Sequence, residues 1–451
     1  MSFFPSNFNY YYKINPKYTF INNNLTGAVD FIEGRFWDFF ISGEYEKIPI
    51  EILENLFDRG YIYKNTDKEK YFLKKLFKNF LKIASKNIKR FVFVPTYYCN
   101  LSCTYCFENN LNQDNIIFSD AILKKAFEII KKINPNNNYK IELYGGEPLL
   151  PKTKKIINKI ISFSLISDSK VTIISNGIYI KKFISLLLQI HNNIEMIQVT
   201  LDGIKDINDS RRKFKSGKGT FLIISKNIST LLENGINVCL RVNIDNSNID
   251  YIVDFYNYLL KTGWLKKSNF DVKLSLVADH RSSVYKNNIV TEEELLKKLI
   301  NLYDRFPQLE KTFKYYAFKQ VRNIINILEG APNNSPRFFN CEANILEYII
   351  FCPDGYLYTC PESIGNKEFA IGMFYPEFSF FKDNKIKWIS RNIYSIKKCS
   401  SCSFSPICGG GCNYAAFIQN KTEPVCERFN EVLDTFFKLR GEKILKSHGL
   451  M

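Results

Sequence analysis

Short apolar runs alternate with amphipathic segments through the middle of the chain, between residues 89 and 305. This alternation predicts successive βα units that build a parallel sheet. The predicted strands are Phe91–Pro95, Lys140–Leu143, Lys170–Ile174, Met196–Leu201, Asn237–Asn243 and Asp271–Leu276. Six strands with helices between them predict an α/β protein built on a partial (β/α)6 TIM-type barrel. In such barrels the chemistry lies at the carboxyl ends of the strands.

A different pattern precedes the barrel. Residues 1–88 are expected to form a small α+β domain, whose predicted elements are the aromatic strands Tyr10–Ile14 and Tyr18–Asn22, helices around Gly27–Ser42 and Ile48–Arg59, and the short strand Tyr61–Tyr63. No cysteine occurs in this region, because the first one in the chain is Cys99.

The region that follows the barrel, residues 306–451, changes character along its length. Helical bridging sequence leads into a cysteine-dense, turn-rich block from Cys341 to Cys426, and a helical tail is predicted at Arg428–His448. The block has few apolar runs, so we expect something other than a hydrophobic core to hold it together. Metal coordination can supply that stability.

Composition indicates a folded chain, since 45% of the residues are hydrophobic and 24% are charged. The formal net charge of +17 could indicate nucleic acid or an acidic partner. The lysines are scattered, however, which favours solvated surfaces, with an acidic peptide as the alternative. We therefore expect no nucleic-acid partner.

No stretch approaches the ~20 apolar residues that span a bilayer, and Met1 to Tyr12 lacks a basic region followed by an apolar one. We expect a cytoplasmic protein with no membrane partner. Twelve cysteines in that compartment indicate metal binding rather than disulfides, because the cytosol keeps thiols reduced.

Three cysteines follow the first predicted strand at the spacing C-x3-C-x2-C, namely Cys99, Cys103 and Cys106. Three thiolates in one loop can hold a [4Fe–4S] cluster and leave one iron without a protein ligand. The alternatives are a zinc site and unconnected buried cysteines. Structural zinc usually takes four protein ligands, and no fourth Cys or His lies near in sequence.

With Tyr105 before its last cysteine, this motif resembles that of the radical S-adenosylmethionine (SAM) family. The resemblance implies that Cys99, Cys103 and Cys106 hold the catalytic cluster and that SAM chelates the open iron through its amino and carboxylate groups. One-electron cleavage of SAM then gives a 5′-deoxyadenosyl radical that takes hydrogen from the substrate. Tyr105 is expected near the cofactor.

Further turns fall at the ends of the predicted strands. Gly145-Gly146-Glu147, before Pro148, resembles the family's turn beside the methionine amino group, where glycine permits a close approach. Ser175 and Asn176 resemble the family's polar turn near the SAM ribose and carboxylate. Each turn alone is a weak signal, and their order along the chain gives them weight.

Two more strands supply the remaining candidates for SAM binding. Thr200 and Asp202 resemble the family's Ser-x-Asp-Gly segment, and Arg212 is placed to pair with the SAM carboxylate, which suits a planar guanidinium. On the fifth strand, Arg241 and Asn243 are further candidates. Cys239 lies on the same strand and is expected to be a small buried thiol.

The second group of cysteines resembles the SPASM extension, the auxiliary-cluster domain of radical SAM enzymes that mature peptides and proteins. Its pattern reads Cys341-x13-Gly355-x4-Cys360, then Cys399-x2-Cys402-x5-Cys408-x3-Cys412, and finally Cys426. The resemblance implies two auxiliary [4Fe–4S] clusters, with the outer one held by Cys399, Cys402, Cys408 and Cys426 and the inner one by Cys341, Cys360 and Cys412. The fold class becomes a partial barrel with a cysteine-rich C-terminal iron–sulfur domain.

The fourth ligand of the inner cluster is left open. Cys352 either ligates it or lies in the strand before the Pro353-Asp354-Gly355 turn, and we favour the strand. Without Cys352, one inner iron is open to the substrate. The alternative for the whole block is a set of zinc knuckles, for which C-x5-C-x3-C spacing is unusual.

The N-terminal region bears a looser resemblance to the winged-helix-like leader-binding domains of enzymes that modify ribosomally made peptides. Such a domain binds an extended leader by adding it as a strand to a sheet edge. The alternative is a structural cap over one end of the barrel. The implied partners are a precursor peptide with a leader and an electron donor such as flavodoxin or ferredoxin.

These features predict a peptide maturase, with a thioether link from a cysteine sulfur to a residue carbon as the specific reaction. Carbon–carbon crosslinking or epimerisation could use the same framework. The runner-up is an anaerobic sulfatase maturase, whose acidic base follows the cysteine equivalent to Cys360, where this chain has Pro361. A tRNA-modifying enzyme fits the second cysteine group poorly. A non-catalytic iron–sulfur electron carrier is the alternative from another class.

Overall fold

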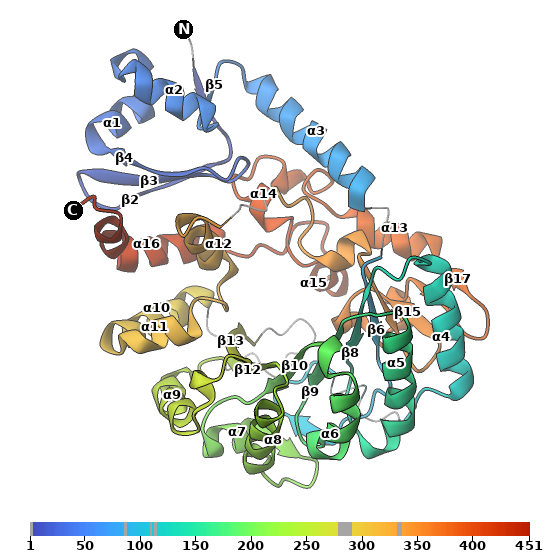
Figure 1. Ribbon diagram of the computed structural model, residues 1–451. Coiled ribbons are helices and arrows are strands. Elements are labelled where there is room, and N and C mark those ends of the chain that lie inside the picture. The colour runs from blue at the N-terminus through green and yellow to red at the C-terminus, as the bar shows by residue number, and fades with distance from the viewer. Residues whose placement is uncertain (1–2, 85–87, 109–110, 112–114, 278–290, 332–335) are drawn as a thin grey trace.

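The structure is a computed structural model that describes residues 3–84, 88–108, 111, 115–277, 291–331 and 336–451 (Figure 1). Its centre is a sheet in which the six predicted barrel strands pair in parallel and in chain order. These strands are β6 (Arg90–Phe93), β8 (Lys140–Leu143), β9 (Val171–Ser175), β10 (Ile194–Thr200), β12 (Val238–Ile244) and β13 (Phe270–Leu276). The predicted α/β partial barrel is confirmed.

Helices between these strands cover the outer side of the curved sheet (Figure 1). They are α4 (Asp120–Ile133), α5 (Lys154–Ile166), α6 (Ile180–Gln189), α7 (Lys205–Arg211), α8 (Phe221–Glu233) and α9 (Ile252–Lys261). A small antiparallel pair, β7 (Leu101–Cys103) and β11 (Arg212–Phe214), lies at the carboxyl end of the barrel strands.

The sheet continues into the cysteine-rich block, which corrects our expectation that the block lacks a hydrophobic core. The strand β14 (Tyr348–Phe351) pairs in parallel with β6. Three further strands follow it and bring the sheet to ten strands: β15 (Tyr356–Tyr358), β16 (Gly372–Met373) and β17 (Ser379–Phe380). Phe351 and Leu357 are fully buried in the same core as the barrel. These strands are only two to four residues long, so they leave no long apolar run in the sequence.

The N-terminal region contains a three-stranded antiparallel sheet with helices, and one prediction there is wrong. The predicted helix Gly27–Ser42 begins only at Gly34, because Val29–Glu33 forms an edge strand beside the central strand. A short apolar run fits either structure. The elements are β1 (Phe4–Pro5), β2 (Asn9–Lys13), β3 (Tyr18–Asn23), β4 (Val29–Glu33), α1 (Gly34–Ser42), α2 (Ile50–Asp58), β5 (Ile62–Tyr63) and α3 (Thr66–Ala84).

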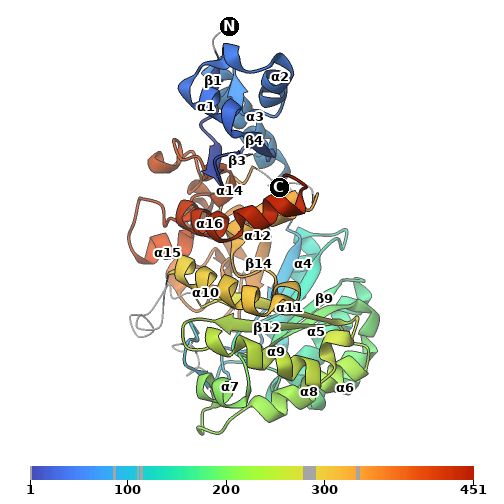
Figure 2. The same cartoon turned by 90° about the vertical axis from the view of Figure 1, so that its left-hand side faces the viewer.

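Aromatic contacts join this region to the C-terminal block. Phe20 of β3 packs on Phe437 with ring centroids 4.1 Å apart, and the Tyr10 hydroxyl donates to Asp434 at 2.8 Å. Phe77 of α3 packs on Phe338 at 5.0 Å. In Figure 2 the N-terminal region accordingly lies on the C-terminal block, away from the barrel.

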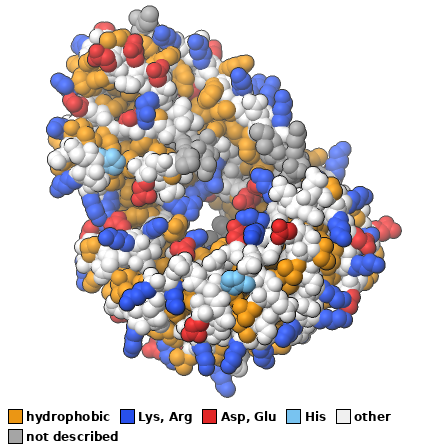
Figure 3. Space-filling model, viewed as in Figure 1, with side chains coloured by type: hydrophobic (Ala, Val, Ile, Leu, Met, Phe, Trp, Pro, Cys, Tyr) orange, Lys and Arg blue, Asp and Glu red, His pale blue; other side chains and the backbone are white. Residues whose placement is uncertain are grey.

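The remaining helices complete the block and its bridge to the barrel, and the predicted helical tail is confirmed. They are α10 (Glu292–Arg305), α11 (Pro307–Phe313), α12 (Lys319–Leu328), α13 (Lys382–Ser390), α14 (Ser405–Cys408), α15 (Asn413–Ile418) and α16 (Phe429–Ser447). Within the described residues, none of the helices combines the length and the apolar character needed to cross a bilayer. Lys and Arg side chains are spread over the face in Figure 3, with acidic ones between them.

Candidate functional site

The residues predicted to bind the first cluster and SAM gather around one cavity. The cavity has a volume of about 260 Å³ and lies at the carboxyl ends of the barrel strands. Every predicted residue of this site except Asp202 lines it: Cys99, Cys103, Tyr105, Cys106, Gly145, Gly146, Glu147, Ser175, Asn176, Thr200, Arg212, Arg241 and Asn243. Residues that are up to 142 positions apart in the chain therefore meet in one place.

The cysteine loop is held between two neighbours. On one side, β7 pairs with β11 so that Cys103 lies opposite Arg212. On the other side, the turn after β8 packs under the residues that precede Cys99. A Cβ atom on Gly146 would lie 2.4 Å from the backbone carbonyl oxygen of Tyr97 and 2.5 Å from that of Tyr98. Gly146 is thus required where two backbones touch, a role that our prediction of a close approach to SAM did not include.

The buried Glu147 carboxylate connects this turn to the next one. It accepts hydrogen bonds from the Ser175 hydroxyl at 2.8 Å, the Asn176 amide at 2.6 Å and the Leu149 amide at 2.9 Å. Burial raises its pKa to about 7, and these donors oppose the rise. The Asn176 side chain in turn donates to the Cys99 sulfur at 3.6 Å. The two predicted turns therefore support the cysteine loop directly.

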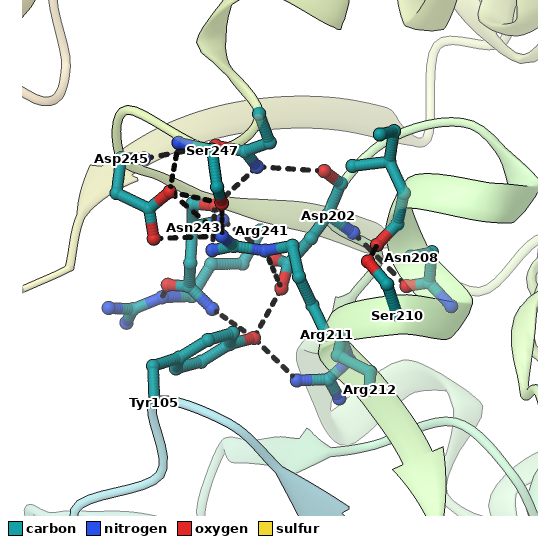
Figure 4. Close-up of polar contacts among 12 residues, drawn as sticks. Tyr105, Asp202, Asn208, Ser210, Arg211, Arg212, Arg241, Asn243, Asp245 and Ser247 are labelled. Atoms are coloured by element: carbon teal, nitrogen blue, oxygen red, sulfur yellow. Dashed lines mark hydrogen bonds and ion pairs between the residues drawn. The ribbon is translucent and has the colours of Figure 1, made fainter. Parts of the chain in front are cut away.

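A second network surrounds the Tyr105 hydroxyl (Figure 4). This hydroxyl donates to Asp202, and it accepts from Arg212 Nη1 at 2.9 Å and from Asn243 Nδ2 at 3.0 Å. The second oxygen of Asp202 accepts from the Asn243 amide at 2.9 Å. Asp202 thus positions Tyr105 and the end of β12 instead of lining the cavity, while Arg241 lines the cavity and donates to the Asn243 side chain at 2.8 Å.

Sequence reasoning missed two members of this network, Arg211 and its partner Asp245. The Arg211 guanidinium bonds to Asp245 at 2.8 Å and lies over the Tyr105 ring, 5.0 Å from the centroid (Figure 4). The sequence shows two adjacent arginines, Arg211 and Arg212. It does not indicate that their side chains bind different partners. In the structure Arg211 is neutralised by carboxylates, and Arg212 faces the cavity.

Arg212 has a buried donor atom without a partner among the described residues, as expected of a residue that binds an anionic ligand. Its Nε atom is buried and has no hydrogen-bond partner among the described residues, although its Nη1 bonds to Tyr105. A buried donor without a partner costs about 1–3 kcal/mol, so such a group needs a reason. A carboxylate in the cavity would satisfy this donor, which fits the carboxylate of SAM.

The four cysteines predicted to hold the outer cluster line a second cavity of about 530 Å³, and they are Cys399, Cys402, Cys408 and Cys426. The glycine run between Cys408 and Cys412 shapes it. Gly411 has φ +77°, and a Cβ atom there would lie 1.9 Å from the Val425 oxygen. This contact holds the residues before Cys426 against the residues after Cys408, so Cys426 joins the three earlier thiols around one volume.

The three cysteines predicted for the inner cluster are neighbours of one another. Burial raises the pKa of the Cys360 thiol well above its usual value, and the nearby Glu362, Cys341 and Cys412 raise it further. Glu362 also lines the 260 Å³ cavity, so it lies next to both that cavity and the inner cysteines.

Two other cysteines stand apart from these groups. Cys352 is fully buried at the end of β14 and lies beside Tyr97 and Asp354, with no cysteine among the groups that raise its pKa. Cys239 is buried in β12. Both positions agree with the structural roles that we favoured from the sequence.

In the described parts of the chain, no three or more His, Cys, Asp or Glu side chains converge on the position of a single metal ion. A cluster of four irons and four sulfides is larger than one ion, so its ligands surround a volume such as the cavities above.

Comparison with known proteins agrees with this geometry. Residues 93–259 match the Radical SAM superfamily. This segment is a radical SAM domain. Together with the relatives that are named as enzymes, this match supports an enzyme that uses radical chemistry, and proteins of the Radical SAM superfamily bind a [4Fe–4S] cluster and SAM. The electron carrier without catalytic activity is not supported.

Several similar proteins match most of the length of this chain. It is 26% identical to a cysteine-type anaerobic sulfatase-maturating enzyme of Clostridium novyi over 70% of this chain and 84% of that protein. The structure of native anSMEcpe with bound AdoMet has a TM-score of 0.60 at 17% identity, covering 80% of this chain and 100% of that one. Streptococcus suis SuiB bound to precursor peptide SuiA has a TM-score of 0.56 at 14% identity, covering 94% and 98%. These structures share the fold.

We expect Gly146→Ala to prevent assembly of the first cluster, because the added methyl group would push the turn away from the backbone before Cys99. Iron and sulfide content after anaerobic reconstitution should fall by one cluster, and deoxyadenosine formation should cease. Gly217→Ala is the control: its φ of +83° disfavours alanine locally, but an added Cβ atom there would meet nothing within 4 Å, so the first cluster should still assemble. Full iron content in the Gly146 variant contradicts this role.

We expect Arg212→Lys to weaken SAM binding by about tenfold or more, since lysine keeps the charge and loses the planar pair of donors. Calorimetric titration of the reconstituted protein with SAM measures the change. Lys213→Ala, on the same strand, should leave the Kd unchanged. Equal Kd values for wild type and Arg212→Lys would remove Arg212 from the SAM site.

Proposed function

We propose that this radical SAM enzyme modifies a ribosomally made peptide, and that its SAM site is the 260 Å³ cavity. The observation that carries the proposal is the occurrence, in one chain, of this cavity, two further groups of clustered cysteines and a separate N-terminal domain. The likeness to SuiB, which extends over 94% of this chain and includes a bound precursor peptide, supports it.

Within the proposal, Cys99, Cys103 and Cys106 hold the first cluster. SAM bound there supplies, on one-electron reduction, a 5′-deoxyadenosyl radical that abstracts a hydrogen atom from the substrate. The protein holds SAM by its carboxylate through Arg212, whose buried Nε lacks a partner among the described residues. Thr200 and Arg241 complete the wall of the cavity.

The remaining cysteines are proposed to hold two auxiliary [4Fe–4S] clusters. The outer set surrounds its own cavity, and the inner set has three thiols. Since Cys352 lies beside Tyr97 rather than with the inner set, the inner cluster would keep one iron for another ligand. A cysteine thiolate of the substrate is a suitable ligand for such an iron.

Thioether formation is the proposed reaction because it uses that open iron. A substrate C–H bond and an S–H bond break, a C–S bond forms, and the product has two hydrogen atoms fewer than the peptide. One hydrogen leaves in 5′-deoxyadenosine, the thiol proton goes to solvent, and the remaining electron returns to the enzyme. The inner cluster would be a suitable acceptor for that electron because its cysteines lie near the SAM cavity. Glu362 lies next to both the cavity and these cysteines.

Residues 1–88 are proposed to bind the leader of the precursor peptide, which would add a strand to the sheet. β2 and β4 are the outer strands of that sheet, with β3 between them. Because β2 carries Tyr10 and Tyr12 onto Phe437 of α16, the edge of β4 is the better site. We propose that the enzyme and its peptide act in the cytoplasm.

Formylglycine formation on a protein is the second candidate, because one observation favours it. Pro361 occupies the position at which the sulfatase-maturase family carries its acidic base, yet Glu362, the next residue, lines the SAM cavity. The two reactions give products of different mass. A thioether removes two hydrogen atoms from the peptide, whereas formylglycine replaces the thiol sulfur and two hydrogens with one oxygen.

The experiment is anaerobic reconstitution, addition of SAM and dithionite, and analysis for 5′-deoxyadenosine, followed by mass spectrometry of the peptide encoded by a short cysteine-bearing open reading frame beside the gene. Deoxyadenosine with a peptide two hydrogens lighter supports the proposal. A peptide that is unchanged, or one that carries formylglycine, rejects the thioether reaction.

Single cysteine variants should separate the clusters. Cys103→Ala should abolish deoxyadenosine formation, because the first cluster loses a ligand. Cys402→Ala should lower peptide modification more than SAM cleavage, because it removes a ligand of the outer set. Equal loss of both activities in Cys402→Ala would mean that the auxiliary domain is mainly structural.

A further inference from the structure

A groove lies between α3 and the loops that carry the first outer cysteines. Its volume is about 920 Å³. Apolar side chains form much of its wall, from Phe8 of the N-terminal region, Leu73, Phe77 and Leu81 of α3, and Ile393 and Tyr394 of the block. The groove is open to solvent and separate from the SAM cavity, with which it shares no lining residue.

Lysines follow α3 along the rim of this groove. Lys70, Lys74 and Lys78 line it at four-residue intervals, which places them on one side of the helix. All three are exposed, and none forms an ion pair with another described residue. Figure 3 shows basic side chains along α3 on this face. The groove is therefore apolar inside and positive at its edge.

Cys399 connects the groove to the outer cysteines. It lines the groove and also the 530 Å³ cavity that Cys402, Cys408 and Cys426 line. Ser401 and Ser405 line both as well. A partner in the groove would thus be separated from the proposed outer cluster by the wall that contains one of its ligands.

We propose that the groove, with Lys70, Lys74 and Lys78 at its rim, is the docking surface for a small acidic electron-transfer protein that reduces the enzyme through the outer cluster. The inference rests on the proposed function, since it needs a cluster at the outer cysteines. An apolar groove with like charges along one edge suits a transient redox complex, in which charge complementarity guides association and a small interface permits release.

An acidic peptide is the competing occupant, and the place of the groove favours the redox protein. A substrate gains nothing from contact with Cys399, whereas electron transfer requires a short distance to a cluster. An electron donor is needed for the first reduction of the enzyme, because each SAM cleavage takes up one electron. In thioether formation that electron returns to the enzyme, so the donor is then oxidised by one electron only for each deoxyadenosine released without product.

The test uses the reconstituted enzyme and an acidic flavodoxin as the probe. Changing Lys70, Lys74 and Lys78 together to Glu should raise the Kd for flavodoxin, measured by anaerobic calorimetry, by at least about tenfold. Deoxyadenosine formation driven by subsaturating reduced flavodoxin should fall by a similar factor. The dithionite-driven rate should not change, because dithionite needs no docking surface, and the wild-type Kd should rise with salt.

The matched control lies on the same helix. Lys68, Lys75 and Lys82 are exposed, do not line the groove and fall on the opposite side of α3. Their triple change to Glu alters the net charge equally and should leave the Kd within about twofold, since exposed charges that make no contact contribute little. Iron content and circular dichroism establish that both variants fold, and Lys→Gln changes at the rim should give an intermediate Kd.

Three results would overturn the docking surface. These are an unchanged Kd in the rim variant, an equal rise in the control variant, and a rise in the KM for the peptide under dithionite with the flavodoxin Kd unchanged. The last result would assign the groove to the peptide. Failure of the proposed function is separate, because wild-type enzyme with SAM and dithionite would then form no deoxyadenosine.

Discussion

The site depends on the contact between the turn after β8 and the cysteine loop. Gly146 lets two backbones touch, and the Glu147 amide donates to the Tyr98 oxygen at 3.0 Å. The Glu147 carboxylate then fastens the same turn to Ser175 and Asn176. Because Glu147 is buried, its three donors matter more than they would in water. Glu147 and its partner Asn176 thus connect the ends of two barrel strands, β8 and β9, to the loop that carries the thiols.

The continuous sheet sets the relation between the first site and the auxiliary cysteines. β14 pairs with β6, the strand that precedes the cysteine loop, so the block that follows β14 begins beside the SAM cavity. Cys360 follows β15 by two residues, and Glu362 reaches the cavity wall. The outer cysteines lie farther along the block, next to α3. Because the short strands are buried in the shared core, the core packing fixes the distance between the first site and the auxiliary cysteines. A block held together by metal alone would lack this packing.

The barrel and the site residues were predictable because their signals are local. Each barrel strand is an apolar run of ordinary length, and the cysteine spacings and strand-end turns are motifs in the sequence itself. The β4 edge strand could not be predicted, because Val29–Glu33 is too short for its pattern alone to distinguish a strand from a helix. The β6–β14 pairing and the separate partners of Arg211 and Arg212 depend on contacts between distant residues, which no local pattern contains.

The ionisation of the thiols shows why the cysteine sites need their clusters. Burial raises the pKa of the thiols of Cys99, Cys103, Cys106, Cys341, Cys360, Cys399, Cys408 and Cys412. Thiolates bind metal, and a raised pKa means that the protein alone keeps these groups protonated at neutral pH. Cluster binding must therefore release protons, and the positive charge of iron must offset the cost of burying the thiolates. Burial isolates the radical chemistry from water. The same burial keeps each thiol protonated until metal binds and stabilises the thiolate.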